Sequence, residues 1–239
     1  EVAAGADICT IEEAHDFMEK VPEEQRFMAT SCCPAWSVMA KKLFPEQANC
    51  ISMALTPMTL TARLIKHHQP GAKVAFIGPC AAKKLEAMRR TVRSEVDFVL
   101  TFEEMAGIFE ARHIDVNTLK EDPHGVNDAS ADGRNFAVSG GVAQAVVNVI
   151  KEKYPDREIK VANAEGLSEC RKLMMMAKAG KYNGYLLEGM ACPGGCVAGA
   201  GTMQSIKKSS VAVNMYAKQA EHQVATGTHH VAELDKLVD

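Results

Sequence analysis

The sequence predicts a two-lobed α/β fold in which each lobe has a small mixed sheet flanked by helices. Three observations lead to this prediction. Short apolar runs with strand composition alternate with longer stretches of helical periodicity. A polar, glycine-containing stretch at 122–134 separates two halves, which we take as lobes 1–121 and 122–239. With 239 residues and 47% hydrophobic content, the chain is long enough to bury a core.

The first lobe is predicted to carry most of the helices. Apolar residues recur at spacings of three and four after Thr10, which indicates an amphipathic helix. Proline is favoured at the first position of a helix, so Pro34 is expected to begin one. The Gly78-Pro79 pair ends the apolar run at 73–77. The expected helices span 10–20, 34–45, 57–68 and 102–111, and the expected strands span 73–77 and 96–100.

The second lobe is predicted to contain three strands and several helices. From residues alone, 135–141 indicates a strand and a turn, followed by a helix with Val142, Val146 and Ile150 on one face. Further strands are expected at 160–163 and 185–187, with a helix at 165–178 and two helices after Ser209. The His229-His230 pair is expected at the surface, and Cys50 and Cys170 are expected to be buried structural residues.

Composition excludes several classes of function. A formal net charge of −3 argues against a nucleic-acid partner. No apolar run approaches the length of a membrane helix, so no membrane span is expected. Eight cysteines without a secretory segment are typical of a reducing compartment, where thiols bind metal or stay free. We therefore expect a cytoplasmic protein.

Three cysteine-containing loops, each with a proline, are predicted to form one metal site. They are Thr30-Ser31-Cys32-Cys33-Pro34-Ala35-Trp36, the run from Phe76 to Glu86 around Cys80, and the run from Leu187 to Cys196. Glycines in such loops allow backbone amides to approach a bound group closely. Cys32 and Cys33 precede a helix, whose dipole is expected to lower both thiol pKa values. Cys80 follows the carboxyl end of a predicted parallel strand, where open α/β sheets place ligands.

These segments resemble the three signature motifs of the iron-only (FeFe) hydrogenases, T-S-C-C-P-x-W, x-P-C-x-x-K-x-x-E and E-x-M-A-C-x-G-G-C. The similarity runs from about Ala6 to at least Gly199. It implies a minimal or truncated, divergent catalytic domain whose H-cluster lies in the cleft between the lobes. The cluster joins a 4Fe-4S cubane to a di-iron unit carrying CO, CN and a bridging azadithiolate. The implied thiolate ligands are Cys33, Cys80, Cys192 and Cys196.

The resemblance also implies roles for residues around the cluster. Cys32 exchanges protons with the cofactor, and protons reach it along Asp16, Ser52 and Glu13, with Asp16 replacing a glutamate. From the residues alone, Glu13 and Asp16 lie one turn apart on a solvated helix face. Lys83 would donate to a cyanide ligand, with Glu86 beside it. The remaining implied pocket residues are Pro79, Phe136, Ser139 and Met190.

The implied activity is the reversible conversion of 2H+ and 2e- to H2 in anaerobic hydrogen metabolism. The family's accessory iron–sulfur domains are not in this sequence, so electrons are expected from a ferredoxin, another electron-carrier protein or another subunit. Separate maturation proteins would supply the di-iron unit.

Three alternatives remain open. The chain resembles iron–sulfur assembly proteins descended from the same family, although Cys32, Lys83 and Met190 argue for the hydrogenase. Gly78, where methionine is common, and the sequence after Gly199 depart from the family pattern, which leaves a sensory member with slow turnover as an alternative, although Cys32 favours turnover. A structural zinc module is the third alternative, and the wide ligand spacing disfavours it.

Overall fold

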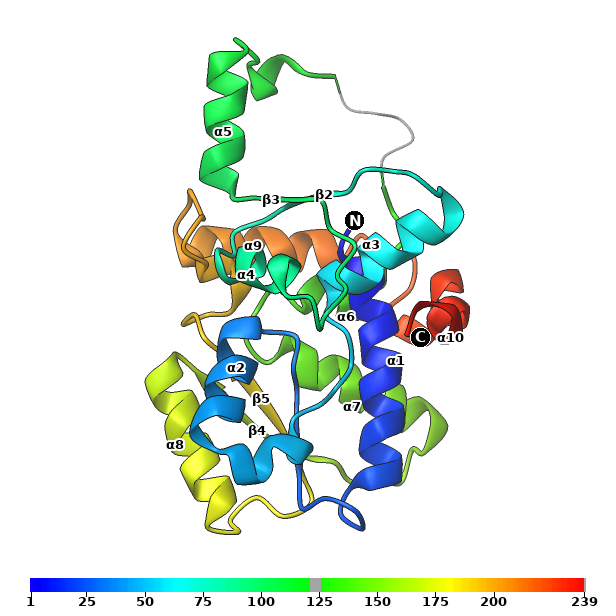
Figure 1. The fold of residues 1–239 in the computed structure, drawn as a ribbon. Helices are drawn as coiled ribbons and strands as arrows, with labels where there is room; N and C mark the ends of the chain where they lie inside the picture. The colour runs from blue at the N-terminus through cyan, green and yellow to red at the C-terminus, as the bar shows by residue number, and fades with distance from the viewer. Residues whose placement is uncertain (121–125, 239) are drawn as a thin grey trace.

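The computed structural model describes residues 1–120 and 126–238, and it alternates helices with short strands (Figure 1). The strands are β1 Met28–Ala29, β2 Ala75–Ile77, β3 Phe98–Leu100, β4 Lys160–Glu165 and β5 Tyr185–Met190. The α-helices are α1 Ala3–Lys20, α2 Pro34–Leu43, α3 Pro57–His68, α4 Ala82–Met88, α5 Phe102–Ala111, α6 Ala131–Asn135, α7 Gly141–Lys153, α8 Leu167–Lys178, α9 Ile206–Ala217 and α10 Leu234–Leu237. Short 3-10 segments are η1 Pro45–Cys50, η2 Val116–Thr118, η3 Cys196–Ala198, η4 Ala225–Gly227 and η5 His229–Glu233.

The larger sheet has the strand order β1-β5-β4, and both strand pairs are parallel. Leu186 and Leu187 of the central strand β5 are both fully buried. Successive side chains of a strand point to opposite faces, so both faces of this sheet are covered. Leu187 packs in a cluster with Trp36 of α2 and Met174 of α8. Leu186 packs in another with Phe17 of α1 and with residues of α7.

The smaller sheet pairs β2 with β3 in parallel. It lies at the opposite end of the molecule from the bulk of the larger sheet, and α5 projects beyond it (Figure 1). A capping box formed by Thr101 and Glu104 fixes the start of α5. None of the residues of α5 is buried.

The predicted α/β class with small sheets flanked by helices is confirmed, with the difference that every described strand pair is parallel rather than mixed. The division into lobes 1–121 and 122–239 stays a prediction. Strand β1 comes from the first of these ranges and pairs with β5 from the second. Part of the predicted separating stretch, 122–125, lies outside the described residues.

Three expectations about local structure were wrong. Helix α1 begins at Ala3 rather than near Thr10. The sequence pattern missed its first turns because they are buried on all sides and show no amphipathic period. Small residues permit this: a Cβ added at Gly5 would lie 2.2 Å from the Pro57 carbonyl oxygen on α3. The stretch 135–141 holds the end of α6 and a turn instead of a strand. His230 is 2% exposed, because it contacts the buried Asp7 carboxylate.

The parallel strands place the cysteine loops at their carboxyl ends. Strand β1 is followed by Cys32 and Cys33, β2 by Cys80, and β5 by Cys192. Parallel strands in one sheet have their carboxyl ends at the same edge. The fold therefore brings loops from distant parts of the sequence together.

Candidate metal centre

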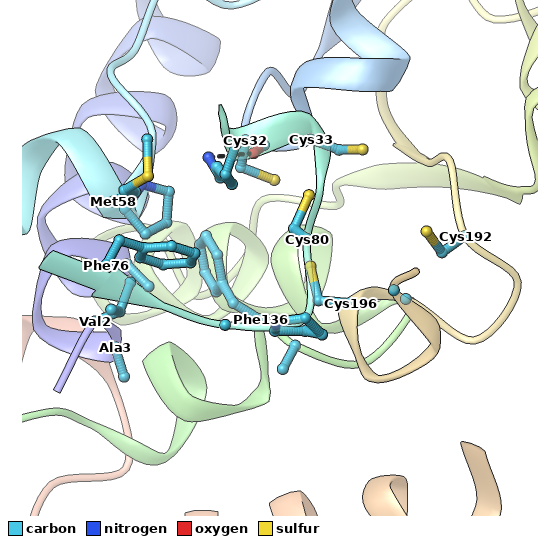
Figure 2. A pocket seen from close by; sticks show the side chains of 18 of the residues that line it. Val2, Ala3, Cys32, Cys33, Met58, Phe76, Cys80, Phe136, Cys192 and Cys196 are labelled. Atoms are coloured by element: carbon cyan, nitrogen blue, oxygen red, sulfur yellow. Dashed lines mark hydrogen bonds between the residues drawn. The ribbon is translucent and has the colours of Figure 1, made fainter. Parts of the chain in front are cut away.

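The three cysteine loops surround one cavity of about 240 Å³. Figure 2 shows the side chains of Cys33, Cys80, Cys192 and Cys196 toward one end of the cavity, with Met58 and Phe76 at the other end. The cavity is lined by all five motif cysteines, Cys32, Cys33, Cys80, Cys192 and Cys196. The remaining three, Cys9, Cys50 and Cys170, are buried, as expected for Cys50 and Cys170.

Glycine conformations shape the loop that carries Cys192 and Cys196. Gly194 and Gly195 have φ values of +92° and +95°, which glycine adopts without a Cβ penalty. The Ser139 N–H donates to the Gly194 carbonyl oxygen at 3.1 Å, and a Cβ at Gly195 would lie 2.6 Å from the same nitrogen. The loop is thus held against the turn before α7, and this contact sets the position of Cys196.

The sulfur spacing suits a cluster better than a single metal ion. A tetrahedral zinc ion, with Zn–S bonds of about 2.3 Å, brings its sulfurs to roughly 3.8 Å from one another. Among the residues that the structure describes, no three cysteine sulfurs lie within 4.8 Å of one another. A polynuclear cluster carries its own iron and sulfide atoms between the ligands and needs the wider spacing. The zinc alternative is therefore disfavoured.

The thiols act on one another electrostatically. Burial raises the pKa of Cys196 to about 12, and the neighbouring Cys33 and Cys80 add to this shift. Burial and the same two neighbours also raise the pKa of Cys192. Iron ions supply the positive charge that deprotonates such coordinating thiols. The Ala191 N–H already points to the Cys33 sulfur at 3.5 Å, as a donor to a thiolate would. The donor set therefore fits an iron–sulfur cluster.

Lys83 brings a cation to the wall of the cavity. Its ammonium donates to Glu86 Oε2 at 2.6 Å and to the Cys32 carbonyl oxygen at 3.4 Å. An ammonium group has three donors, so one remains for an anionic ligand in the cavity. Glu86 is 4% exposed and does not line the cavity. It positions Lys83 through their ion pair.

Cys32 faces the cavity and lies beside Glu13. Burial raises the pKa of Cys32 well above its ordinary value, and the Glu13 carboxyl and the Cys9 thiol add to the shift. The expected lowering by the helix dipole was wrong for Cys32, because burial and the nearby acidic group outweigh it. Cys32 is therefore a neutral thiol that can donate a proton.

Glu13 is fully buried, and burial raises its pKa to about 7. Its Oε1 accepts from the Ser31 N–H at 3.2 Å, and a hydrogen bond with the Ser52 side chain acts against the rise in pKa. Cys32, Glu13 and Ser52 are thus brought together. Asp16 is not: among the interactions of the described residues its partner is Lys20, at 2.7 Å.

The other expected pocket residues divide into two groups. Pro79, Phe136 and Met190 line the cavity and form apolar walls. Ser139 does not line it and acts through its backbone contact with Gly194.

Sequence reasoning missed several residues that build the site. Met58 and Arg134 line the cavity, and no motif marks them. Phe76 also lines it, and although it begins the run around Cys80, it was given no role. Glu188 is fully buried and accepts from the Gly140 and Ala143 N–H groups at 2.6 and 2.7 Å. It thereby fixes the start of α7 and the turn that holds the Cys196 loop. Its place in the E-x-M-A-C motif was a signal in the sequence that could have identified it.

Residues 1–200 match the family described as "Iron only hydrogenase large subunit, C-terminal domain". The chain belongs to this iron-only hydrogenase family. One relative is the periplasmic [Fe] hydrogenase large subunit of Nitratidesulfovibrio vulgaris, 29% identical over 82% of this chain and 57% of that protein. Another is the cytosolic Fe-S cluster assembly factor NAR1 of Kluyveromyces lactis, 26% identical over 59% of this chain and 32% of that protein. The chain thus spans little more than half, or less, of the length of these relatives.

Solved structures share the fold. A variant of apo [FeFe]-hydrogenase HydA1 from Chlamydomonas reinhardtii superposes with a TM-score of 0.77 at 22% identity, covering 98% of this chain and 78% of the other. The relatives that this chain resembles thus include both a hydrogenase and an iron–sulfur assembly factor. In the described part of the chain, no helix is both long and apolar enough to cross a bilayer.

Proposed function

We propose that this chain is the catalytic domain of an iron-only hydrogenase and interconverts H2 with protons and electrons. The observation that carries the proposal is one cavity lined jointly by the four candidate ligand cysteines, the neutral thiol Cys32 and the cation of Lys83. A bound H-cluster would supply the redox chemistry and the hydrogen-binding iron atoms. The protein's own residues would bind the cluster, exclude water and move protons.

The cysteines would hold the cluster from three loops. Cys33, Cys80, Cys192 and Cys196 would ligate the cubane, and the resemblance implies that Cys196 would also hold the di-iron unit. Apolar walls exclude water, so a donor such as Lys83 is stronger there than in solvent. Backbone hydrogen bonds and side-chain partners such as Glu165, which accepts from the Gly194 N–H at 2.7 Å, keep the ligands in place before a cluster arrives.

Cys32 and Glu13 would move the proton. The thiol of Cys32 is neutral and faces the cavity, so it can pass its proton to a bound group. The Glu13 carboxyl, with a pKa of about 7, can then return a proton to it. Electrons would come from a ferredoxin, another electron-carrier protein or a further subunit. Maturation proteins would deliver the di-iron unit in the cytoplasm.

Infrared spectroscopy tests the proposal. The protein is reconstituted anaerobically with a cubane and then given a synthetic di-iron precursor. We expect sharp carbonyl and cyanide bands that differ from those of the free precursor and change under hydrogen. C196A, which lacks the ligand implied for both parts of the cluster, should show only the precursor bands. A wild-type protein with a cubane and no such bands would overturn the proposal.

The second candidate is an iron–sulfur assembly or sensory protein without rapid turnover. The similarity to NAR1 favours it. It predicts cubane loading without hydrogen evolution, so the same infrared and activity measurements separate the two.

A further inference from the structure

A second buried carboxyl group lies on α1 next to Glu13. Glu12 Oε2 is buried and has no hydrogen-bond partner among the described residues, and the same holds for Glu13 Oε2 and Thr56 Oγ1. Buried polar atoms without protein partners are normally satisfied by ordered water. These three atoms, two on α1 and one just before α3, are therefore places where ordered water can bind.

The loop before α3 connects the two carboxyl groups. The Ser52 side chain of this loop hydrogen-bonds with Glu13. The Ala54 carbonyl oxygen of the same loop accepts a hydrogen bond from the Ser31 hydroxyl at 3.0 Å. The backbone N–H of Leu55, one residue further on, hydrogen-bonds with Glu12. One short loop thus spans the distance from Glu13 to Glu12.

The surroundings of Glu12 suit proton exchange. Burial raises its pKa to about 7, the nearby Asp16 raises it further, and Lys20 and Arg63 act in the opposite direction. Glu12 is also the neighbour of Glu13 in the sequence, and its negative charge raises the pKa of Glu13 further. Asp16 has a shorter side chain and is engaged by Lys20 at 2.7 Å.

We propose that Glu12, rather than Asp16, is the outer proton-relay residue of this chain, exchanging protons between solvent and Glu13. This role rests on the proposed function. One proton moves from water to the Glu12 carboxylate and leaves through buried water or hydroxyl groups toward Glu13. Only O–H bonds form and break, and the reverse path serves hydrogen oxidation.

Isotope exchange in the cluster-free chain tests the relay without any turnover. The carboxylic C=O band of Glu13, identified by its loss in E13Q, is followed by rapid infrared spectroscopy after mixing into D2O at about pH 6, where this group is mostly protonated. We expect E12Q to slow the deuterium shift of this band roughly tenfold or more, and D16N to slow it less than about twofold. E19Q, an exposed change on the same helix, is the control and should exchange like the wild type. E12D should restore part of the rate.

The outcomes are decisive. Unchanged exchange in E12Q, or slower exchange in D16N than in E12Q, would overturn the proposal. Hydrogen turnover of the cluster-loaded variants is measured in parallel and should follow the same order. If the loaded wild type shows no turnover, the proposed function fails. The exchange rates still decide whether protons reach Glu13 through Glu12.

Discussion

At the scale of single residues, the site depends on four thiols that share one cavity with Cys32. We expect C33A, C80A, C192A and C196A each to lose most of the iron and sulfide after anaerobic reconstitution, because each removes one of four ligands. C50A is the matched control: Cys50 is 5% exposed and belongs to the hydrophobic cluster around Trp36. It should keep its iron and lose about 1 kcal/mol of stability. Iron loss in C50A equal to that in C80A would contradict the ligand assignment.

Lys83 and Glu86 form a buried ion pair with side-chain exposures of 10% and 5%. Removing the cation leaves a buried carboxylate without compensation, so K83M should lower the free energy of unfolding by about 3 kcal/mol. K83M/E86Q should recover part of this loss, since neither residue then carries a charge. Urea denaturation of the cluster-free chain measures both. A double variant no more stable than K83M would show that Glu86 does not depend on Lys83.

The buried Glu13 makes stability depend on pH. Burial raises its pKa from 4.5 to about 7, so the folded chain binds more protons than the unfolded chain between these values. The contribution is full below about pH 4.5 and is lost as pH rises through about 7, which lowers the free energy of unfolding by roughly 3 kcal/mol. E13Q should show a shallower dependence, with the remaining slope due to the other carboxyl groups whose pKa burial raises, Glu12, Glu188 and Asp132. Denaturation curves from pH 5 to 8 that run parallel in wild type and E13Q would contradict this assignment, whereas E19Q should match the wild type.

How far single residues could be predicted depends on what marks them. The cysteines stand in long motifs, and the structure brings all five to one cavity. Glu12 could not be found from periodicity, because an acidic residue beside Glu13 on a helix indicates a solvated face. Its burial results from packing against the loop before α3, which is a tertiary contact.

At the scale of elements, the loop after β5 owes its shape to glycine. G195A would place a Cβ 2.6 Å from the Ser139 nitrogen and 2.8 Å from the Ala137 carbonyl oxygen. We expect it to displace Cys196 and to lower both iron content and stability. G180A is the matched control, because Gly180 has a φ of +87° and nothing within 4 Å of the added Cβ. It should cost about 1 kcal/mol from the backbone alone and leave iron content unchanged. Equal iron loss in both variants would show that the contact with Ser139 does not matter.

Elements were predictable where burial is one-sided or where proline marks a boundary. The expected helices at 57–68 and 102–111 coincide with α3 and α5, and the one expected at 34–45 begins with α2, which ends at Leu43. The first turns of α1 were missed because Ala4 to Thr10 are buried all round and carry no helical period. The burial of His230 was missed for a related reason, since its partner Asp7 is more than two hundred residues away.

At the scale of the whole molecule, the candidate ligands come from both sheets, while much of the core lies elsewhere. The clusters around Leu187 and Leu186 pack α2 and α8 on one face of the larger sheet and α1 and α7 on the other. Both are built mainly from residues outside the cavity lining, which predicts that the cluster-free chain folds. The sequence predicted that the three loops form one site, but it could not supply the pairing of β1 with β5, a contact between distant segments that places the Cys33 and Cys192 loops at one edge of a single sheet.

A cluster that binds only the folded chain must stabilise it. Cys33 follows β1, Cys80 follows β2, and Cys192 follows β5, so the four ligand positions coexist only when both sheets are in place. Cluster binding at a hundred times its dissociation constant raises the free energy of unfolding by about 2.7 kcal/mol. Anaerobic urea denaturation should therefore show a higher midpoint after reconstitution in the wild type and no rise in C80A. Circular dichroism should find similar helix content before and after loading. A large gain of helix on loading would mean that the cluster folds the chain, and an unchanged midpoint would mean that the four thiols do not hold it together.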